Sequence, residues 1–204
     1  MRVRELKTKK VFCETIETHA GGMPSIPGLN ATVAELNYAA DLSAQAAMSA
    51  GAGFAGTGTI YKSAVERIGN LVKTTLFLDL TGAASSTTDL DIIGTSGVSH
   101  IGQITAAVNG TIVGGVITCL EAPAGGVADI DLYSATEGTG AFDGGVAALA
   151  ETALVTSGGA WTSGASKGFL ANPAANAYLY LTGGAAGTAA SYTAGQFKIE
   201  IWGV

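Results

Sequence analysis

The chain has 204 residues, enough for one domain with an appendage or for two small domains. Only 13% of the residues are charged, about half the usual share of roughly 25%, and the net charge is −6. No run of 18 apolar residues occurs and there are only two cysteines, so we expect neither a transmembrane helix nor a disulfide scaffold. So few charges suit a surface that copies of the chain or a larger partner cover.

The first ten residues concentrate the positive charge. Their five basic side chains and one glutamate sum to +4, which leaves −10 for the rest of the chain. Prolines and glycines interrupt residues 1–30, so we expect an extended arm that lies on another surface. The arm lacks interleaved aromatic residues, which favours an acidic protein surface over nucleic acid as its partner. The residues expected to bind that partner are Arg2, Arg4, Lys7, Lys9, Lys10 and Phe12.

A short helix is predicted within residues 30–50. Thr32 and Glu35 have the spacing of a capping box, and the apolar face of the helix is mostly alanine. Such a face would hold weakly on its own, because alanine buries little apolar surface.

The glycines after this helix predict a flexible linker. Three of them spell G-x-G-x-x-G, but a dinucleotide-binding loop follows a strand and precedes a helix, and here the order is reversed. We therefore expect no cofactor. The glycines are Gly51, Gly53, Gly56 and Gly58. We divide the chain into an extended N-terminal arm with a short helix and a Gly-rich linker, residues 1–60, and a β-sandwich domain, residues 61–204.

From residue 59 onward the hydrophobic period changes to two, which predicts strands. Residues 71–80 alternate between aliphatic and polar side chains, and Phe77 breaks the pattern. Further strand-like runs are residues 90–93, 99–108, 111–121, 127–133, 177–182 and 196–202.

The last of these runs has the cleanest alternation. In it we expect Phe197, Ile199 and Ile201 to face the core and the charged residues between them to face outward.

The dipeptide Asn109-Gly110 is the strongest hairpin signal in the chain, and it predicts that the runs on either side of it pair. About seven or eight short strands separated by turn signals are typical of an antiparallel sandwich. The predicted fold class is mainly β: an antiparallel β-sandwich or jelly roll with an extended N-terminal arm and one short helix.

Two pairs of aspartates, Asp89/Asp91 and Asp129/Asp131, have the i, i+2 spacing that places both carboxylates on one face of a strand. Together with carbonyl oxygens or water, such a pair could hold a hard cation. We favour a solvated outer face instead, because charges there oppose aggregation, and we expect no metal site.

His19 and His100 are the only histidines. No nucleophile elbow accompanies them and neither has metal-ligand spacing, so we expect no enzyme. Cys119 lies in an apolar run and is expected in the core, and a disulfide bridge to Cys13 is the less favoured alternative.

Five aromatic residues could form a glycan-binding platform on a sandwich, although packing in the core or between subunits is the favoured interpretation. They are Trp161, Tyr178, Tyr180, Tyr192 and Trp202.

Several stretches, which cover about residues 30–204, resemble structural proteins of marine tailed-phage virions. They are ATVAELNYAADLS (31–43), TGTIYKSAVERIGNLVKTTLFLDLTG (57–82), HIGQITAAVNGTIVGGVITCLEAPAGG (100–126), DIDLYSATEGTG (129–140), AYLYLTGG (177–184) and YTAGQFKIEIWG (192–203). The resemblance implies a virion protein and supplies no catalytic residue.

Within that class we expect a capsid decoration (cement) protein on the surface of the phage head. It would bind and stabilise the head through its N-terminal arm and its subunit contacts. The expected partners are the major capsid protein and copies of the chain itself, with a trimer favoured, and no membrane is expected. The alternatives are a tail, neck or fibre component and a glycan-binding β-sandwich adhesin.

Overall fold

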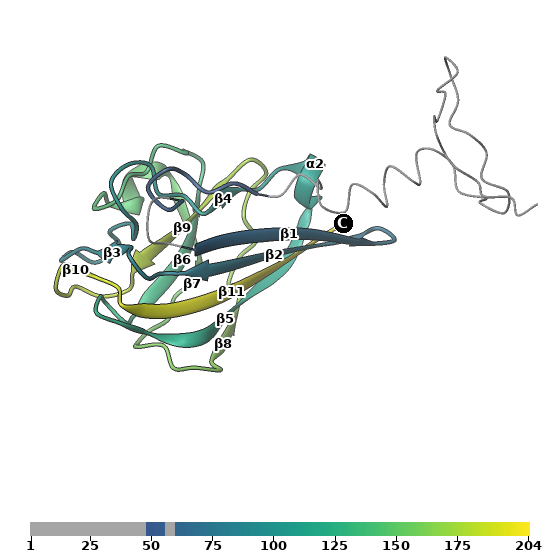
Figure 1. Cartoon of the computed structure of the whole chain (residues 1–204). Coiled ribbons are helices and arrows are strands. Elements are labelled where there is room, and N and C mark those ends of the chain that lie inside the picture. The colour runs from purple at the N-terminus through teal and green to yellow at the C-terminus, as the bar shows by residue number, and fades with distance from the viewer. Residues whose placement is uncertain (1–47, 56–59) are drawn as a thin grey trace, which may run out of the picture. The chain divides into compact units, whose positions relative to one another are not determined.

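The computed structural model describes residues 48–55 and 60–204, which belong to the compact unit Gln45–Val204. Strands in three antiparallel sheets dominate this unit (Figure 1). The described residues also contain one short α-helix, α2 (Ala106–Asn109), and one 3-10 helix, η2 (Val146–Leu149). The predicted mainly β class with antiparallel sheets is confirmed.

The largest sheet has five strands in the order β1-β2-β11-β5-β8, with every neighbouring pair antiparallel. Its strands are β1 (Ile60–Ile68), β2 (Leu71–Asp79), β11 (Ala194–Gly203), β5 (Ile112–Ala124) and β8 (Ser166–Gly168).

A four-stranded sheet in the order β4-β9-β6-β7 forms a second layer, and β10 and β3 pair separately (Figure 1). The strands of these two sheets are β4 (Gly102–Gln103), β9 (Tyr178–Gly183), β6 (Ile130–Ala135), β7 (Glu151–Val155), β10 (Ala190–Ser191) and β3 (Ala84–Ser85).

The main hydrophobic core lies between the two larger sheets. The five-stranded sheet contributes residues such as Leu76 and Ile199, and the four-stranded sheet contributes residues such as Leu132 and Leu181, all of them fully buried. Each such side chain contributes about 1.5–3 kcal/mol when it leaves water. This core is the main source of stability for the sandwich.

A second hydrophobic cluster covers the other face of the four-stranded sheet. Tyr133 and Tyr180 form a cross-strand pair on that face, and Ile92, Val146 and Leu149 from connecting segments pack with them. All six residues of β6 are therefore buried, whereas burial alternates along β2 and β11. Among the described residues, the four-stranded sheet is covered on both faces and the five-stranded sheet on only one.

The predicted alternation in the C-terminal strand is confirmed. In β11, Phe197, Ile199 and Ile201 are at most 1% exposed, while Lys198 and Glu200 lie on the opposite, partly exposed face. Residues 71–79 show the same alternation in β2.

The predicted hairpin at Asn109-Gly110 is wrong. Asn109 ends α2, and the only strand within residues 99–108 is the two-residue β4, which belongs to the other sheet. The Asn109 side chain is buried: its Oδ1 accepts a hydrogen bond from the Thr105 amide at 2.8 Å, and its Nδ2 donates to Thr74 Oγ1 at 2.8 Å. This asparagine links the helix to β2 instead of forming a two-residue turn.

Residues 48–55, which the sequence interpretation assigned to the helix and the linker, pack into the sandwich. Phe54 is fully buried, and the Met48 carbonyl accepts hydrogen bonds from Tyr61 Oη at 3.1 Å and Ser63 Oγ at 2.9 Å. None of these eight residues is helical. The described part of the glycine-rich stretch is therefore a packed segment of the domain rather than a flexible linker.

Candidate functional site

The five-stranded sheet has one face that no other described element covers, which we call the outer face. Strand register places on it the even-numbered residues of β1 and β11, the odd-numbered residues of β2, and their partners in β5 and β8. Lys62, Phe77 and Lys198, for example, stand side by side in one row across three strands.

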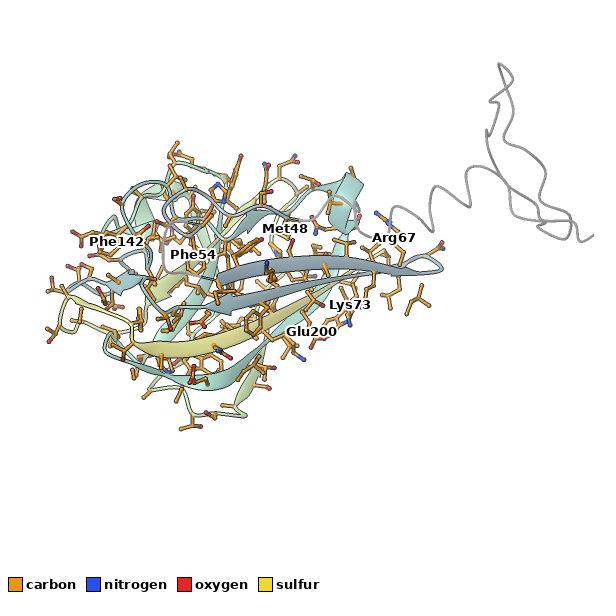
Figure 2. The ribbon with its side chains drawn as sticks, viewed as in Figure 1. Met48, Phe54, Arg67, Lys73, Phe142 and Glu200 are labelled. Carbon is orange, nitrogen blue, oxygen red and sulfur yellow. The ribbon has the colours of Figure 1, made fainter. Side chains whose placement is uncertain are left out.

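Charged side chains on the outer face pair with one another across β1, β2 and β11. Lys73 Nζ lies 2.8 Å from Glu66 and 3.7 Å from Glu200, and Lys198 Nζ lies 3.0 Å from Glu200. Figure 2 labels Lys73 and Glu200 on this sheet. The hydrogen bond that Lys73 donates to the Glu66 carboxylate raises the pKa of Lys73. Exposed pairs of this kind add little stability, but they balance the charge of the face locally.

Large apolar side chains lie between and beyond these charges. Phe77 and Trp202 are half-buried on the outer face, and at the turn of the β1–β2 hairpin Ile68 is 76% and Leu71 40% exposed. The pairing between β11 and β2 ends at Val72. The end of the β1–β2 hairpin therefore extends past β11, as Figure 1 shows. Clusters of exposed apolar side chains are typical of surfaces that bind other proteins.

The dimensions of the outer face suit a protein interface. Nine residues of β2 at about 3.4 Å each give a length of about 30 Å, and five strands at about 4.8 Å spacing give a width of about 19 Å. The resulting flat area of about 600 Å² approaches the roughly 800 Å² that each partner contributes to a standard interface. A face of this size and flatness suits a flat partner.

Sequence reasoning did not identify this face. Phe77 was noted only as an exception to the alternation, and Ile68 and Leu71 were not considered. The available signal was the pair of aliphatic residues that flanks the Gly69-Asn70 turn, where polar residues are usual.

The two described glycines of the glycine motif have amides that are already hydrogen-bonded within the protein. The Gly51 amide donates to the His100 carbonyl at 2.8 Å, and the Gly53 amide donates to the Val98 carbonyl at 2.6 Å. A Cβ on Gly53 would lie 2.6 Å from the Gly97 carbonyl oxygen. Glycine is required here because two backbone segments approach closely.

His100 lies beside a pocket of about 300 Å³ that Gln103 and Thr105 also line. Its ring contacts Tyr178 and Tyr180, at centroid distances of 5.0 Å and 6.3 Å. Burial lowers the pKa of the imidazole, and its Nδ1 has no hydrogen-bond partner among the described residues. The hydroxyl residues Ser49 and Thr105 line the same pocket, but among the described residues no hydrogen bond joins the His100 ring to a hydroxyl or a carboxylate.

The prediction that the aspartate pairs lie on a solvated outer face is wrong for Asp91 and Asp131, whose residues are only 8% and 5% exposed. Asp91 accepts a hydrogen bond from Ser86 Oγ at 2.7 Å, and the same hydroxyl contacts Asp143. Asp89 is exposed, as expected. Both buried carboxylates lie where connecting segments fold over the four-stranded sheet. Within the described ranges no group of three or more His, Cys, Asp or Glu side chains is arranged to hold a metal ion.

The five aromatic residues do not form a common platform. Trp161, Tyr180 and Tyr192 are at most 4% exposed. The Trp161 ring packs edge-on against Phe197 at 5.5 Å, and its Nε1 donates to the Ile130 carbonyl at 2.7 Å. The two half-buried members lie on different sheets. Core packing, the favoured interpretation, is confirmed for the three buried rings.

Cys119 is a free thiol that is fully buried, as expected, and burial raises its pKa. Cys13, His19 and the expected partner-binding residues Arg2, Arg4, Lys7, Lys9, Lys10 and Phe12 lie outside the described residues. No helix in the described part of the chain is long and apolar enough to span a membrane.

Comparisons of the chain with protein-family models, with curated proteins and with solved structures found no match.

Proposed function

We propose that this protein is a structural component of a tailed-phage virion, and specifically a capsid decoration (cement) protein. In this role it binds the head surface and stabilises the shell without catalysing a reaction. The sequence resemblance supports the virion class, and the low charge content supports a surface that other chains cover.

The observation that carries the proposal is the outer face together with the end of the β1–β2 hairpin. Its paired charges and its exposed Ile68 and Leu71 suit contacts between copies of the chain. Each such contact buries a modest area, and repetition over many copies supplies the avidity that one contact lacks. A closed oligomer, with a trimer favoured, is the expected assembly.

Attachment to the shell is assigned to the N-terminal arm. The five basic residues of the first ten complement an acidic surface on the major capsid protein. The arm and the sandwich then have separate tasks, one binding the shell and the other binding neighbouring copies.

Two alternative functions remain. A tail, neck or fibre component would use the same open face and differ only in its place on the particle. A glycan-binding adhesin is less well supported, because three of the five aromatic residues that it needs are buried.

The proposal is tested with purified protein and undecorated heads of the phage that encodes it. A variant without residues 1–30 should keep the circular-dichroism spectrum of a folded sandwich but fail to co-sediment with heads. The double variant Ile68→Ser/Leu71→Ser should stay folded, because exposed substitutions change stability by about 0.5 kcal/mol or less. Native mass spectrometry should show that its oligomer dissociates.

Leu170→Ser is the matched control, because Leu170 is 67% exposed but lies beyond the end of β8, where its amide donates to the Leu154 carbonyl of β7 in the other sheet. This variant should keep both the oligomer and the binding to heads. Binding of the truncated chain at wild-type occupancy, or equal loss of the oligomer in the control, would contradict the proposal.

A further inference from the structure

Two carboxylates converge on one small space at the start of β6. Ser157 Oγ donates to Asp129 Oδ1 and the Ser157 amide donates to Asp131 Oδ1, each at 2.5 Å. A Cβ on Gly184 would lie 2.5 Å from Asp129 Oδ1 and 2.8 Å from Asp131 Oδ1. Both carboxylate oxygens therefore lie close together against the backbone of Gly184, at a place where only glycine fits.

Thr182 provides an independent observation at the same place. It is fully buried, and its Oγ1 has no hydrogen-bond partner among the described residues. Thr182 of β9 pairs directly with Asp131 of β6, so the two side chains share a face of the sheet with Cβ atoms about 4.5–5.5 Å apart. A buried hydroxyl without a partner is unfavourable, so a bound ion or an ordered water at this place would stabilise it.

The negative charge at this place is only partly balanced. None of the ion pairs among the described residues includes Asp129 or Asp131. Lys167 Nζ donates to the Ser157 carbonyl instead of to either carboxylate. Burial raises the pKa of Asp131, and the charges of Asp129 and Asp89 add to this shift, whereas the hydrogen bond from the Ser157 amide and the charge of Lys167 oppose it. A cation between the carboxylates would remove their repulsion.

We propose that the Asp129 and Asp131 carboxylates and the Thr182 hydroxyl bind one hard divalent cation, and that this cation is Ca²⁺. Calcium accepts a flexible set of six to eight oxygen ligands, from carboxylates, neutral oxygens and water, at about 2.3–2.6 Å. Magnesium requires a near-ideal octahedron at about 2.0–2.1 Å, which two strands and a loop do not provide as readily. With two charged ligands the site is weak, with a Kd of about 10⁻⁴–10⁻³ M, as in extracellular calcium modules.

A cation in this position joins the start of β6, the segment after β7 and the end of β9. It therefore fixes one end of the four-stranded sheet. The site does not depend on the proposed virion role, since it is built from contacts within one chain.

The test uses the full chain after EDTA treatment and dialysis. Thermal melting is followed in CaCl₂, in MgCl₂ and in NaCl of equal ionic strength. Calcium at about twenty times its Kd should raise Tm by about 4 °C relative to NaCl. Calorimetric titration with CaCl₂ should give one site per chain.

Three variants locate the site. Asp129→Asn and Thr182→Val should each weaken calcium binding at least about tenfold. Thr182→Val keeps the shape of the side chain, and in EDTA it should melt no lower than the wild type because it removes an unpaired hydroxyl. Asp143→Asn alters the other aspartate cluster, in which Ser86 contacts both Asp91 and Asp143, and this variant should bind calcium as the wild type does.

Three results would overturn the assignment. They are a wild-type Tm that responds to CaCl₂ no more than to NaCl, unchanged binding in both Asp129→Asn and Thr182→Val, and loss of binding in Asp143→Asn. Equal shifts in CaCl₂ and MgCl₂ would overturn the choice of calcium.

Discussion

Truncation of Ile199 tests the assignment of the two faces of the five-stranded sheet. Ile199 is fully buried in β11, where its register neighbours are Leu76 of β2 and Ile117 of β5, both also fully buried. Ile199→Ala removes three carbon atoms, worth about 2.4 kcal/mol at about 0.8 kcal/mol each. The cavity that remains adds to this loss, so the free energy of unfolding should fall by about 2–5 kcal/mol.

Two further substitutions test the same assignment of the faces. Ile199→Val should cost about 0.5–1.5 kcal/mol, because it removes one carbon. The adjacent Lys198→Ala, on the partly exposed outer face, should cost less than about 0.5 kcal/mol. Urea denaturation followed by circular dichroism measures all three values. Equal losses for Ile199→Ala and Lys198→Ala would refute the assignment of the faces.

Two further predictions concern backbone packing and pH. Gly53→Ala should lower the free energy of unfolding by about 1–3 kcal/mol in a urea melt, because its Cβ would meet the backbone of Gly97 and the side chain of Ser99. Gly114→Ala, whose Cβ would meet nothing within 4 Å, should change it little, and similar losses for both would contradict the packed arrangement. For His100, burial lowers the pKa below 6.5, so the unfolded chain takes up its proton at higher pH than the folded chain. The stability that the neutral imidazole contributes is therefore complete above about pH 6.5 and is lost as pH falls through lower values. His100→Gln should remove this part of the pH dependence of unfolding, and an unchanged dependence would show that His100 does not titrate in this way.

Local patterns were sufficient for the fold class and for the faces of the central strands. The alternation in β2 and β11 follows from period-two burial, which each strand shows by itself. The burial of Cys119 also followed from its apolar run.

Features that depend on distant segments could not be read from local patterns. Asn109 looks like a turn residue, but its partner Thr74 is 35 positions away in the sequence. Gly51 and Gly53 look like a linker until the backbone at residues 97–100 is placed against them.

The same limit applies to the candidate sites. The aspartate spacing correctly placed Asp129 and Asp131 together, but only the loops that cover the four-stranded sheet explain why Asp131 is buried. The unpaired Thr182 hydroxyl has no sequence signature, because it depends on strand register.

The most direct test of the proposed function is to locate this protein on purified tailed-phage particles. Antibody raised against the chain should label the head surface in electron micrographs, and quantitative mass spectrometry should give many copies per particle. Label confined to the tail or neck would contradict the decoration role, and absence of the chain from purified particles would contradict a virion role altogether.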